Sequence, residues 1–148
     1  MTYLETVTLD CYCLVQVPRT CRTSEICLAA VTQYGAAIVH VPEEVMTSEI
    51  CLVAVRQHPR ALYWVPEEFK TPEFCLFAVK ECRSDLEDVP EHLRTPEICL
   101  VAIRQNGWYL QYVPEELKTP EICLIALTHA PLVLKYSPYS ILELMSLA

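Results

Sequence analysis

The stretch VPEELKTPEICL at residues 113–124 decides the fold, because the chain repeats it. A close copy, VPEHLRTPEICL, occupies residues 89–100. The Val-Pro pairs begin at residues 17, 41, 65, 89 and 113, so each copy starts 24 residues after the one before it. A period of about 20–50 residues is the signature of a solenoid, in which each repeat buries its apolar face only against its neighbours.

This spacing predicts one domain that covers residues 1–148. Residues 17–136 form five full repeats of 24 residues, counted from Val-Pro. Residues 1–16 and 137–148 align with parts of a repeat, and we expect them to cap the two ends of the array, since both depart from the consensus. In the first of these segments, Tyr3, Val7 and Leu14 fall on core positions.

Each repeat carries the signals of one α-helix, seen most clearly in TPEICLVAIRQNG at residues 95–107. Thr95 is placed to act as the N-cap, because its hydroxyl can accept a hydrogen bond from a free first-turn N–H. Pro96 suits the first helical position, where its missing N–H costs nothing. The charge of Glu97 suits the positive end of the helix dipole. The sequence therefore predicts a helix that begins at this Thr-Pro-Glu motif.

The end of the helix is predicted from glycine and proline. The chain has two glycines, Gly35 and Gly107, and both occupy one repeat position, where we expect a left-handed residue that ends the helix. Pro59 and Pro131 occupy that position in two other repeats and stop the helix by a different route. The third repeat, residues 65–88, carries Arg83 there, so its helix is expected to run on or to end without a left-handed residue.

The rest of each repeat is shorter and predicts a second, brief helix. Pro-Glu-Glu-Leu is long enough for one turn, which suits the α or the 3-10 type. In the repeat around WYLQYVPEEL, the expected buried anchors are Leu110, Val113 and Leu117. No alternation of period two persists, so strands are not expected. The predicted fold is all-α: a helical-repeat solenoid of 24-residue repeats, each with one α-helix and a short second helix.

Five of the nine cysteines share one repeat position: Cys27, Cys51, Cys75, Cys99 and Cys123. Equivalent residues of packed helices lie about 8–10 Å apart, whereas a disulfide needs Cα atoms within about 7 Å. We expect these five cysteines to be small buried hydrophobes in a reducing compartment. A metal site at Cys11, Cys13 and Cys21 is not expected, since no histidine is near and the spacing matches no standard zinc pattern.

The repeat pattern resembles the bacterial family catalogued as domain of unknown function 4116. The likeness rests on Val113 to Leu117, on Thr119 to Leu124 and on Gln105 to Trp108, and weakens before Val17 and after Tyr136. It implies a helical repeat with no established activity or ligand. Members of that family often lie in proteins of host-associated bacteria and of viruses that infect protists. A role as a host- or defence-directed inhibitor would suit such a source. The leucine-rich variant repeat, built of alternating α and 3-10 helices, is similar in architecture only.

Charge and composition narrow the function. The formal net charge is −8, which argues against direct nucleic-acid binding and favours a protein partner with a basic surface. We expect no membrane span and no secretory signal, hence a cytoplasmic protein, or one in the host cytosol if a pathogen or phage delivers it.

The sequence also argues against catalysis. It contains no phosphate loop, no HExxH and no GxSxG. The four histidines occupy different repeat positions, and the Glu-Glu pairs are explained by helix dipoles. We therefore predict a protein that is not an enzyme and that binds no metal or cofactor.

The positions that the repeat does not fix indicate where a partner would bind. Several of them carry aromatic or acidic residues near the turn between the two helical segments, and we expect an interaction edge there. The candidate partner-binding residues are Tyr63, Trp64, Trp108, Tyr109, Tyr112, Tyr136, Asp85, Glu87 and Asp88. The alternatives are that the rings cover the seam between repeats as part of the core, and that the acidic run is a solvated turn.

Three functions follow from this edge. The favoured one is a protein-interaction module that binds through aromatic and acidic residues. The second is an acidic nucleic-acid mimic that blocks a DNA- or RNA-binding protein. The third is a structural spacer or a self-associating repeat, with the oligomeric state left open.

Overall fold

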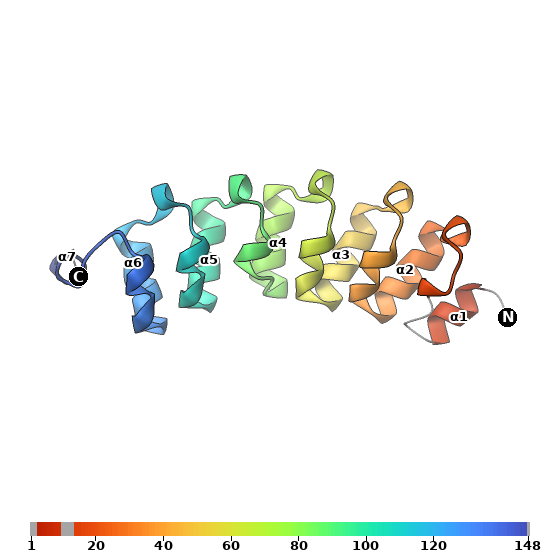
Figure 1. The fold of residues 1–148 in the computed structure, drawn as a ribbon, viewed down its shortest axis with the longest axis horizontal. Helices are drawn as coiled ribbons and strands as arrows, with labels where there is room; N and C mark the ends of the chain where they lie inside the picture. Colours follow the sequence, from red (N-terminus) through yellow and green to blue (C-terminus); the bar gives the residue numbers. More distant parts are fainter. Residues whose placement is uncertain (1–2, 10–13, 148) are drawn as a thin grey trace. The chain divides into compact units, whose positions relative to one another are not determined.

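A computed structural model describes residues 3–9 and 14–147 of the chain. Every regular element within these two ranges is a helix, and none is a strand, which confirms the all-α repeat fold (Figure 1). The α-helices are α1 (Tyr3–Leu9), α2 (Ser24–Gln33), α3 (Ser48–Gln57), α4 (Pro72–Cys82), α5 (Pro96–Gln105), α6 (Pro120–His129) and α7 (Ile141–Leu147).

Between the α-helices lie 3-10 helices of two lengths. Those of six residues are η3 (Gly35–His40), η5 (Pro59–Trp64), η9 (Gly107–Tyr112) and η11 (Pro131–Tyr136). Those of three residues are η2 (Arg19–Cys21), η4 (Glu43–Val45), η6 (Glu67–Phe69), η7 (Leu86–Asp88), η8 (Glu91–Leu93) and η10 (Glu115–Leu117). The prediction of a single short helix after each α-helix is therefore wrong in one respect. The Pro-Glu-Glu turn is a 3-10 helix, but a longer 3-10 helix precedes it in three places (η3 before η4, η5 before η6 and η9 before η10), and a fourth long one, η11, ends the last repeat.

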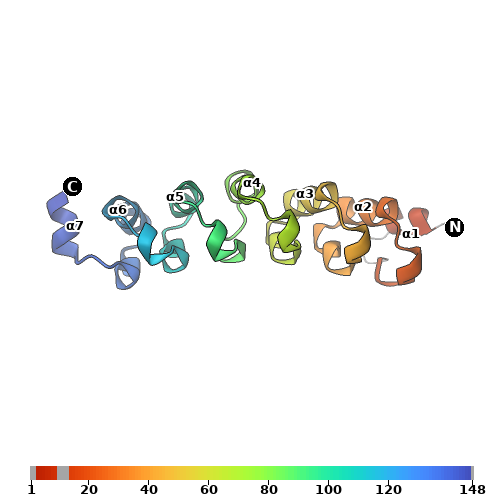
Figure 2. The ribbon, with the colours of Figure 1, turned by 90° about the horizontal axis from the view of Figure 1, so that it is seen from above.

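The chain forms two compact units, residues 1–74 and 75–148, with the boundary inside α4. We call them the N-terminal half and the C-terminal half. In the N-terminal half, α2 and α3 lie side by side in one layer, and η3 and η5 form a second layer (Figures 1 and 2). In the C-terminal half, α5 and α6 are neighbours in the same way, and η9 and η11 lie beside each other.

The α-helices begin as the Thr-Pro-Glu motif predicts. The Thr95 hydroxyl oxygen accepts a hydrogen bond from the Ile98 N–H at 3.3 Å. The same contact recurs three residues after each equivalent threonine, at Thr23, Thr47, Thr71 and Thr119. The capping prediction is thus confirmed along the array.

The prediction of left-handed glycines is wrong. Neither Gly35 nor Gly107 has a positive φ. Each begins a six-residue 3-10 helix, and the preceding residue caps the α-helix in an extended conformation. A Cβ atom on Gly35 would lie 2.5 Å from the Ala54 carbonyl oxygen of the next repeat, and one on Gly107 would lie still closer to that of Ala126. Glycine is needed here for a close approach between repeats, not for its freedom in φ.

The left-handed residue occurs where it was not expected. Arg83 has a φ of 59° and follows α4 directly. The N–H of Ser84 then bonds back to the Ala78 carbonyl oxygen at 3.0 Å, which closes the end of the helix. This turn replaces the first part of a six-residue 3-10 helix, so only the short η7 remains between α4 and the end of the third repeat.

The core follows the repeat positions. The cysteines of the shared position, together with Ala30, Ala54, Ala78, Ala102 and Ala126, are fully buried. None of those five cysteines forms a disulfide, as the spacing predicts. Burial raises the pKa of Cys51 and of Cys99 to about 11, because the interior disfavours a thiolate.

The core positions predicted in addition to the recurring cysteines and alanines are mostly confirmed. Val7 and Leu14 are buried, as are Leu110 and Val113, whereas Leu117 is only partly covered. Tyr3 was expected in the core, but its side chain is exposed. As the first residue of α1, it has no preceding turn of helix to pack against. In residues 3–9 and 14–147, no helix combines the length and the apolar character that a membrane crossing requires.

Candidate interaction surface

The predicted aromatic residues lie on the six-residue 3-10 helices, not on a turn between two helical segments as the sequence suggested. Tyr63 and Trp64 end η5. Trp108, Tyr109 and Tyr112 belong to η9, and Tyr136 ends η11. A 3-10 helix turns through three residues, so residues of one such helix point to different sides. Their environments therefore differ even between neighbours.

In the N-terminal half, Tyr63 and Trp64 form an exposed pair. Their side chains are 67% and 38% exposed. The rings meet edge to face with centroids 5.8 Å apart, a favourable arrangement for two aromatic groups. The buried residues of η5 are Ala61 and Leu62, so the helix is anchored without the two rings.

A cavity of about 250 Å³ opens beside this pair, and residues of three successive repeats line it. Its walls are mostly apolar and include Val15, Tyr34, Val39 and Trp64. Val15 and Val39 are about half exposed, which is unusual for valines at equivalent positions of a repeat. The cavity contains no carboxylate among its lining residues.

A second cavity of about 340 Å³ shares Val39 and His40 with the first, and Arg19 and Arg22 also line it. The Arg22 guanidinium donates to the backbone carbonyl oxygens of Val17 at 2.9 Å, His40 at 2.7 Å and Val15 at 3.3 Å. These bonds join the two ends of the first repeat, reach back to Val15 in the segment before it, and fix the position of the charge.

Two of the predicted acidic residues, Asp85 and Glu87, accept hydrogen bonds from tyrosines of the next repeat. The Tyr109 hydroxyl donates a short hydrogen bond to the Asp85 carboxylate. The Tyr112 hydroxyl donates to the Glu87 carboxylate at 2.6 Å. The structure thus pairs four of the nine predicted site residues between adjacent repeats, with the Tyr109–Asp85 contact partly buried and the Tyr112–Glu87 contact exposed.

These contacts alter the tyrosines electrostatically. Burial, followed by the hydrogen bond to Asp85, holds the pKa of Tyr109 far above its usual value. The hydrogen bond to Glu87 raises the pKa of Tyr112. Burial disfavours the charged phenolate of Tyr109, and in both tyrosines ionisation would also place a second negative charge beside a carboxylate. Asp88, the third predicted acid, is buried rather than part of an exposed patch.

The other two predicted aromatic residues of the C-terminal half, Trp108 and Tyr136, lie near a cation. The Lys135 ammonium lies 5.9 Å from the Trp108 ring centroid and 4.7 Å from that of Tyr136. Trp108 is nevertheless 40% exposed. A cation over an aromatic ring contributes about 0.5–1 kcal/mol at an exposed site.

The described residues offer no candidate metal ligands. Within residues 3–9 and 14–147, no three His, Cys, Asp or Glu side chains gather around one point. Cys11 and Cys13 lie outside the described residues, so the structure does not address the cysteine cluster that contains them.

Sequence reasoning missed the valines of the N-terminal cavity. A signal was present in the repeat position of Tyr63, which carries Val15 and Val39 in the earlier repeats and Glu87, Gln111 and Lys135 in the later ones. The position changes from apolar to polar along the chain. Since charged residues occupy this position in other repeats, the position is exposed, and a valine there is expected to be exposed as well.

The recurrence of an α-helix, a six-residue 3-10 helix and a one-turn 3-10 helix defines an all-α helical-repeat protein. The chain belongs to the family described as Domain of unknown function (DUF4116), whose model matches residues 23–70, 47–94 and 95–142. Each match spans two repeats and begins at an N-cap threonine: Thr23, Thr47 or Thr95. No curated protein and no solved structure matches the chain.

Proposed function

We propose that this repeat protein is a non-enzymatic interaction module that binds another protein through its six-residue 3-10 helices. The observation that carries the proposal is the exposed Tyr63–Trp64 pair, since η5 is anchored by Ala61 and Leu62 without it. Trp108 on η9 offers a second exposed indole. Tryptophan and tyrosine are enriched among the residues that dominate binding energies. Clustered exposed rings on a protein surface commonly mark a partner site.

The proposed partner presents a basic surface to the C-terminal half. Asp85 and Glu87 each accept a tyrosine hydroxyl, and a carboxylate has further lone pairs for a lysine or arginine of the partner. The net charge of −8 would steer a basic surface toward the protein. Such a module acts by occupying a surface, and inhibition of a host or defence protein is one form of that action. None of the cysteines of the described residues forms a disulfide, which supports a reducing compartment such as the cytoplasm.

The test compares the wild-type protein with the double variant Trp64→Ala/Trp108→Ala. Each is immobilised and exposed to an extract of the native source, and retained proteins are identified by mass spectrometry. Arg104→Ala is the matched control, because Arg104 is an exposed residue of α5 and belongs to no 3-10 helix. We expect a protein that the wild type and the control retain and that the double variant loses, at an unchanged melting temperature.

A retained protein is then purified and its affinity measured directly. We expect the double variant to bind at least about tenfold more weakly, a loss of about 1.4 kcal/mol. Equal binding by the double variant would overturn the proposal. A large fall in its melting temperature would also overturn it, because the rings would then belong to the core.

A further inference from the structure

We propose that the N-terminal half carries a two-part site for an acidic, apolar segment of a partner protein. The cavity beside Trp64 takes a bulky apolar side chain, and the adjoining arginine-lined cavity takes a carboxylate next to it in the partner's sequence. This inference rests on the proposed function and adds to it the chemistry of one bound segment.

The first half of the site is the apolar cavity of about 250 Å³. Val15 and Val39 stand at its edge, each about half exposed, and Trp64 and Tyr34 form part of its walls. Covering these groups removes apolar surface from water, which is worth about 25 cal/mol for each Å² buried. The cavity therefore favours a large apolar side chain over a polar one.

One small residue contributes to the open space. Ala36 is the second residue of η3 and lines the cavity. The equivalent second residues of η5, η9 and η11 are Arg60, Trp108 and Leu132. The fold thus accepts large side chains at this position, whereas η3 carries an alanine there.

The second half of the site is positively charged. The acceptors of Arg22 are backbone carbonyl oxygens, which carry no formal charge, so its guanidinium keeps a full positive charge at a fixed place. Arg19 pairs with Glu44 at 3.3 Å, but both side chains are largely exposed, and such pairs contribute little. A carboxylate of the partner can therefore compete for Arg19. Glu43 also lines this cavity and opposes an anion there.

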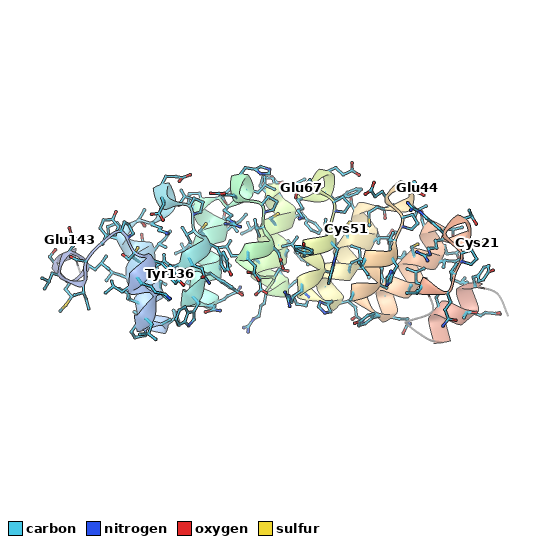
Figure 3. The ribbon with its side chains drawn as sticks, viewed as in Figure 1. Cys21, Glu44, Cys51, Glu67, Tyr136 and Glu143 are labelled. Carbon is cyan, nitrogen blue, oxygen red and sulfur yellow. The ribbon has the colours of Figure 1, made fainter. Side chains whose placement is uncertain are left out.

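The distribution of carboxylates supports an acidic segment. In a chain with 19 acidic residues, residues 34–42 and 58–66 contain none. These stretches hold η3 and η5, the helices beside the first cavity. The glutamates of the N-terminal half lie elsewhere: Figure 3 labels Glu44 and Glu67 on the one-turn helices, at the upper ends of their repeats. The η3–η5 face is where an anionic segment meets the least repulsion.

The test uses three short peptides and the full chain. The probe is the acetylated and amidated pentapeptide GDFDG. The matched peptide GDADG removes the apolar side chain, and GKFKG reverses the charge. The chain has two tryptophans, so in a Trp108→Phe background the fluorescence reports on Trp64 alone. We expect saturable quenching or a spectral shift with GDFDG, and binding at least about tenfold weaker with each matched peptide.

Three substitutions in the same background locate the site. Ala36→Leu adds volume to a residue that lines the cavity, and the equivalent residue of η11 is Leu132, so the fold should tolerate the change and we expect it to abolish GDFDG binding. Arg19→Ala should weaken binding. Glu43→Gln should tighten it, because an anionic occupant gains when an opposing charge is removed. Arg104→Ala is the control and should leave binding unchanged.

Several results would overturn the site. These are equal or tighter binding of GKFKG, undiminished binding to a folded Ala36→Leu variant, and weaker binding to Glu43→Gln. A dimer in light scattering that Ala36→Leu abolishes would also overturn it, in favour of a second copy as the occupant.

A partner that requires Trp108 but binds Ala36→Leu normally would retain the proposed function and reject this site. If the protein discriminates among the peptides as expected, but the extract contains no partner that depends on Trp64 and Trp108, the chemistry of the site is retained and the proposed function is rejected.

Discussion

The helices η5 and η9 are equivalent elements of two repeats, and each carries an exposed tryptophan, yet their tyrosines have different surroundings. On η5, Tyr63 and Trp64 contact each other and are exposed beside an apolar cavity. On η9, Tyr109 and Tyr112 donate hydrogen bonds to Asp85 and Glu87 of the preceding repeat. The difference lies in the repeat before each helix. Before η5 the edge residues are small or apolar, and before η9 they are acidic.

This comparison teaches that a repeat position does not fix an environment. In a solenoid each side chain meets its equivalents in adjacent repeats, so a ring becomes a structural group or an exposed one according to its neighbour's chemistry. Exposed aromatics of the N-terminal half are therefore better binding candidates than the tyrosines of η9. The predictions below test first what the two halves share and then where they differ.

The largest expected loss of stability concerns the two glycines, one in each half, which occupy the same repeat position. Gly35→Ala and Gly107→Ala would each place a Cβ atom against a backbone carbonyl oxygen of the next repeat. Backbone cannot move aside as a flexible side chain can, so we expect each variant to lose about 3 kcal/mol of unfolding free energy. Urea unfolding followed by circular dichroism measures the loss. The control is Ala36→Ser, one residue along η3, where the side chain is only partly buried. A loss similar to that of the control would show that the close approach is not what requires glycine.

The next effect concerns arginines that occupy one repeat position in both halves. Arg94 repeats the contacts of Arg22, donating to the carbonyl oxygens of Val89 at 2.9 Å and Tyr112 at 2.7 Å. Met46 holds the same position in the second repeat, so methionine fits the fold there. We expect Arg22→Met and Arg94→Met each to lower the unfolding free energy by about 2 kcal/mol, since hydrogen bonds from a charged donor are lost. Equal stability to the wild type would contradict a role for these arginines in holding the two ends of their repeats together.

A smaller effect separates the two halves. Tyr109→Phe removes the hydroxyl that donates to Asp85, a partly buried contact, and we expect a loss of about 1 kcal/mol. The matched variant is Tyr63→Phe, which removes a hydroxyl from an exposed ring and should change the unfolding free energy by less than about 0.5 kcal/mol. The two variants are compared in parallel urea titrations. The contrast between the halves fails if both substitutions have the same effect.

The sequence alone predicts the repeated part of the fold well. The period, the N-cap threonines and the buried cysteines are fixed by contacts that every repeat makes, so recurrence reveals them. The ends of the helices were harder, because glycine has two structural uses. Gly107 was interpreted as a left-handed residue, whereas it permits a close approach, and Arg83 took the left-handed conformation instead.

The candidate site was predicted only in part, for a physical reason. A single sequence shows which residues vary among repeats but not what each one meets. Tyr109 and Tyr112 bind Asp85 and Glu87 of the preceding repeat. Predicting this pairing requires knowing how successive repeats align in three dimensions. The N-terminal cavity is lined in part by the small Ala36, which no motif marks.

The last prediction uses pH to test the acid–tyrosine pairs of the C-terminal half. Burial and the hydrogen bond to Asp85 hold the pKa of Tyr109 above its usual value of about 10. A group with a raised pKa in the folded state contributes stability that is complete below its unfolded pKa and is lost as the pH rises through the folded value. We therefore expect stability to fall with rising alkaline pH, and Tyr109→Phe to lose this part of the dependence. In Asp85→Asn, absorbance at 295 nm should show Tyr109 ionising at a lower pH than in the wild type, though still late, because the burial remains. An unchanged titration in Asp85→Asn would mean that burial alone sets the shift, and that the acidic run does not distinguish the two halves electrostatically.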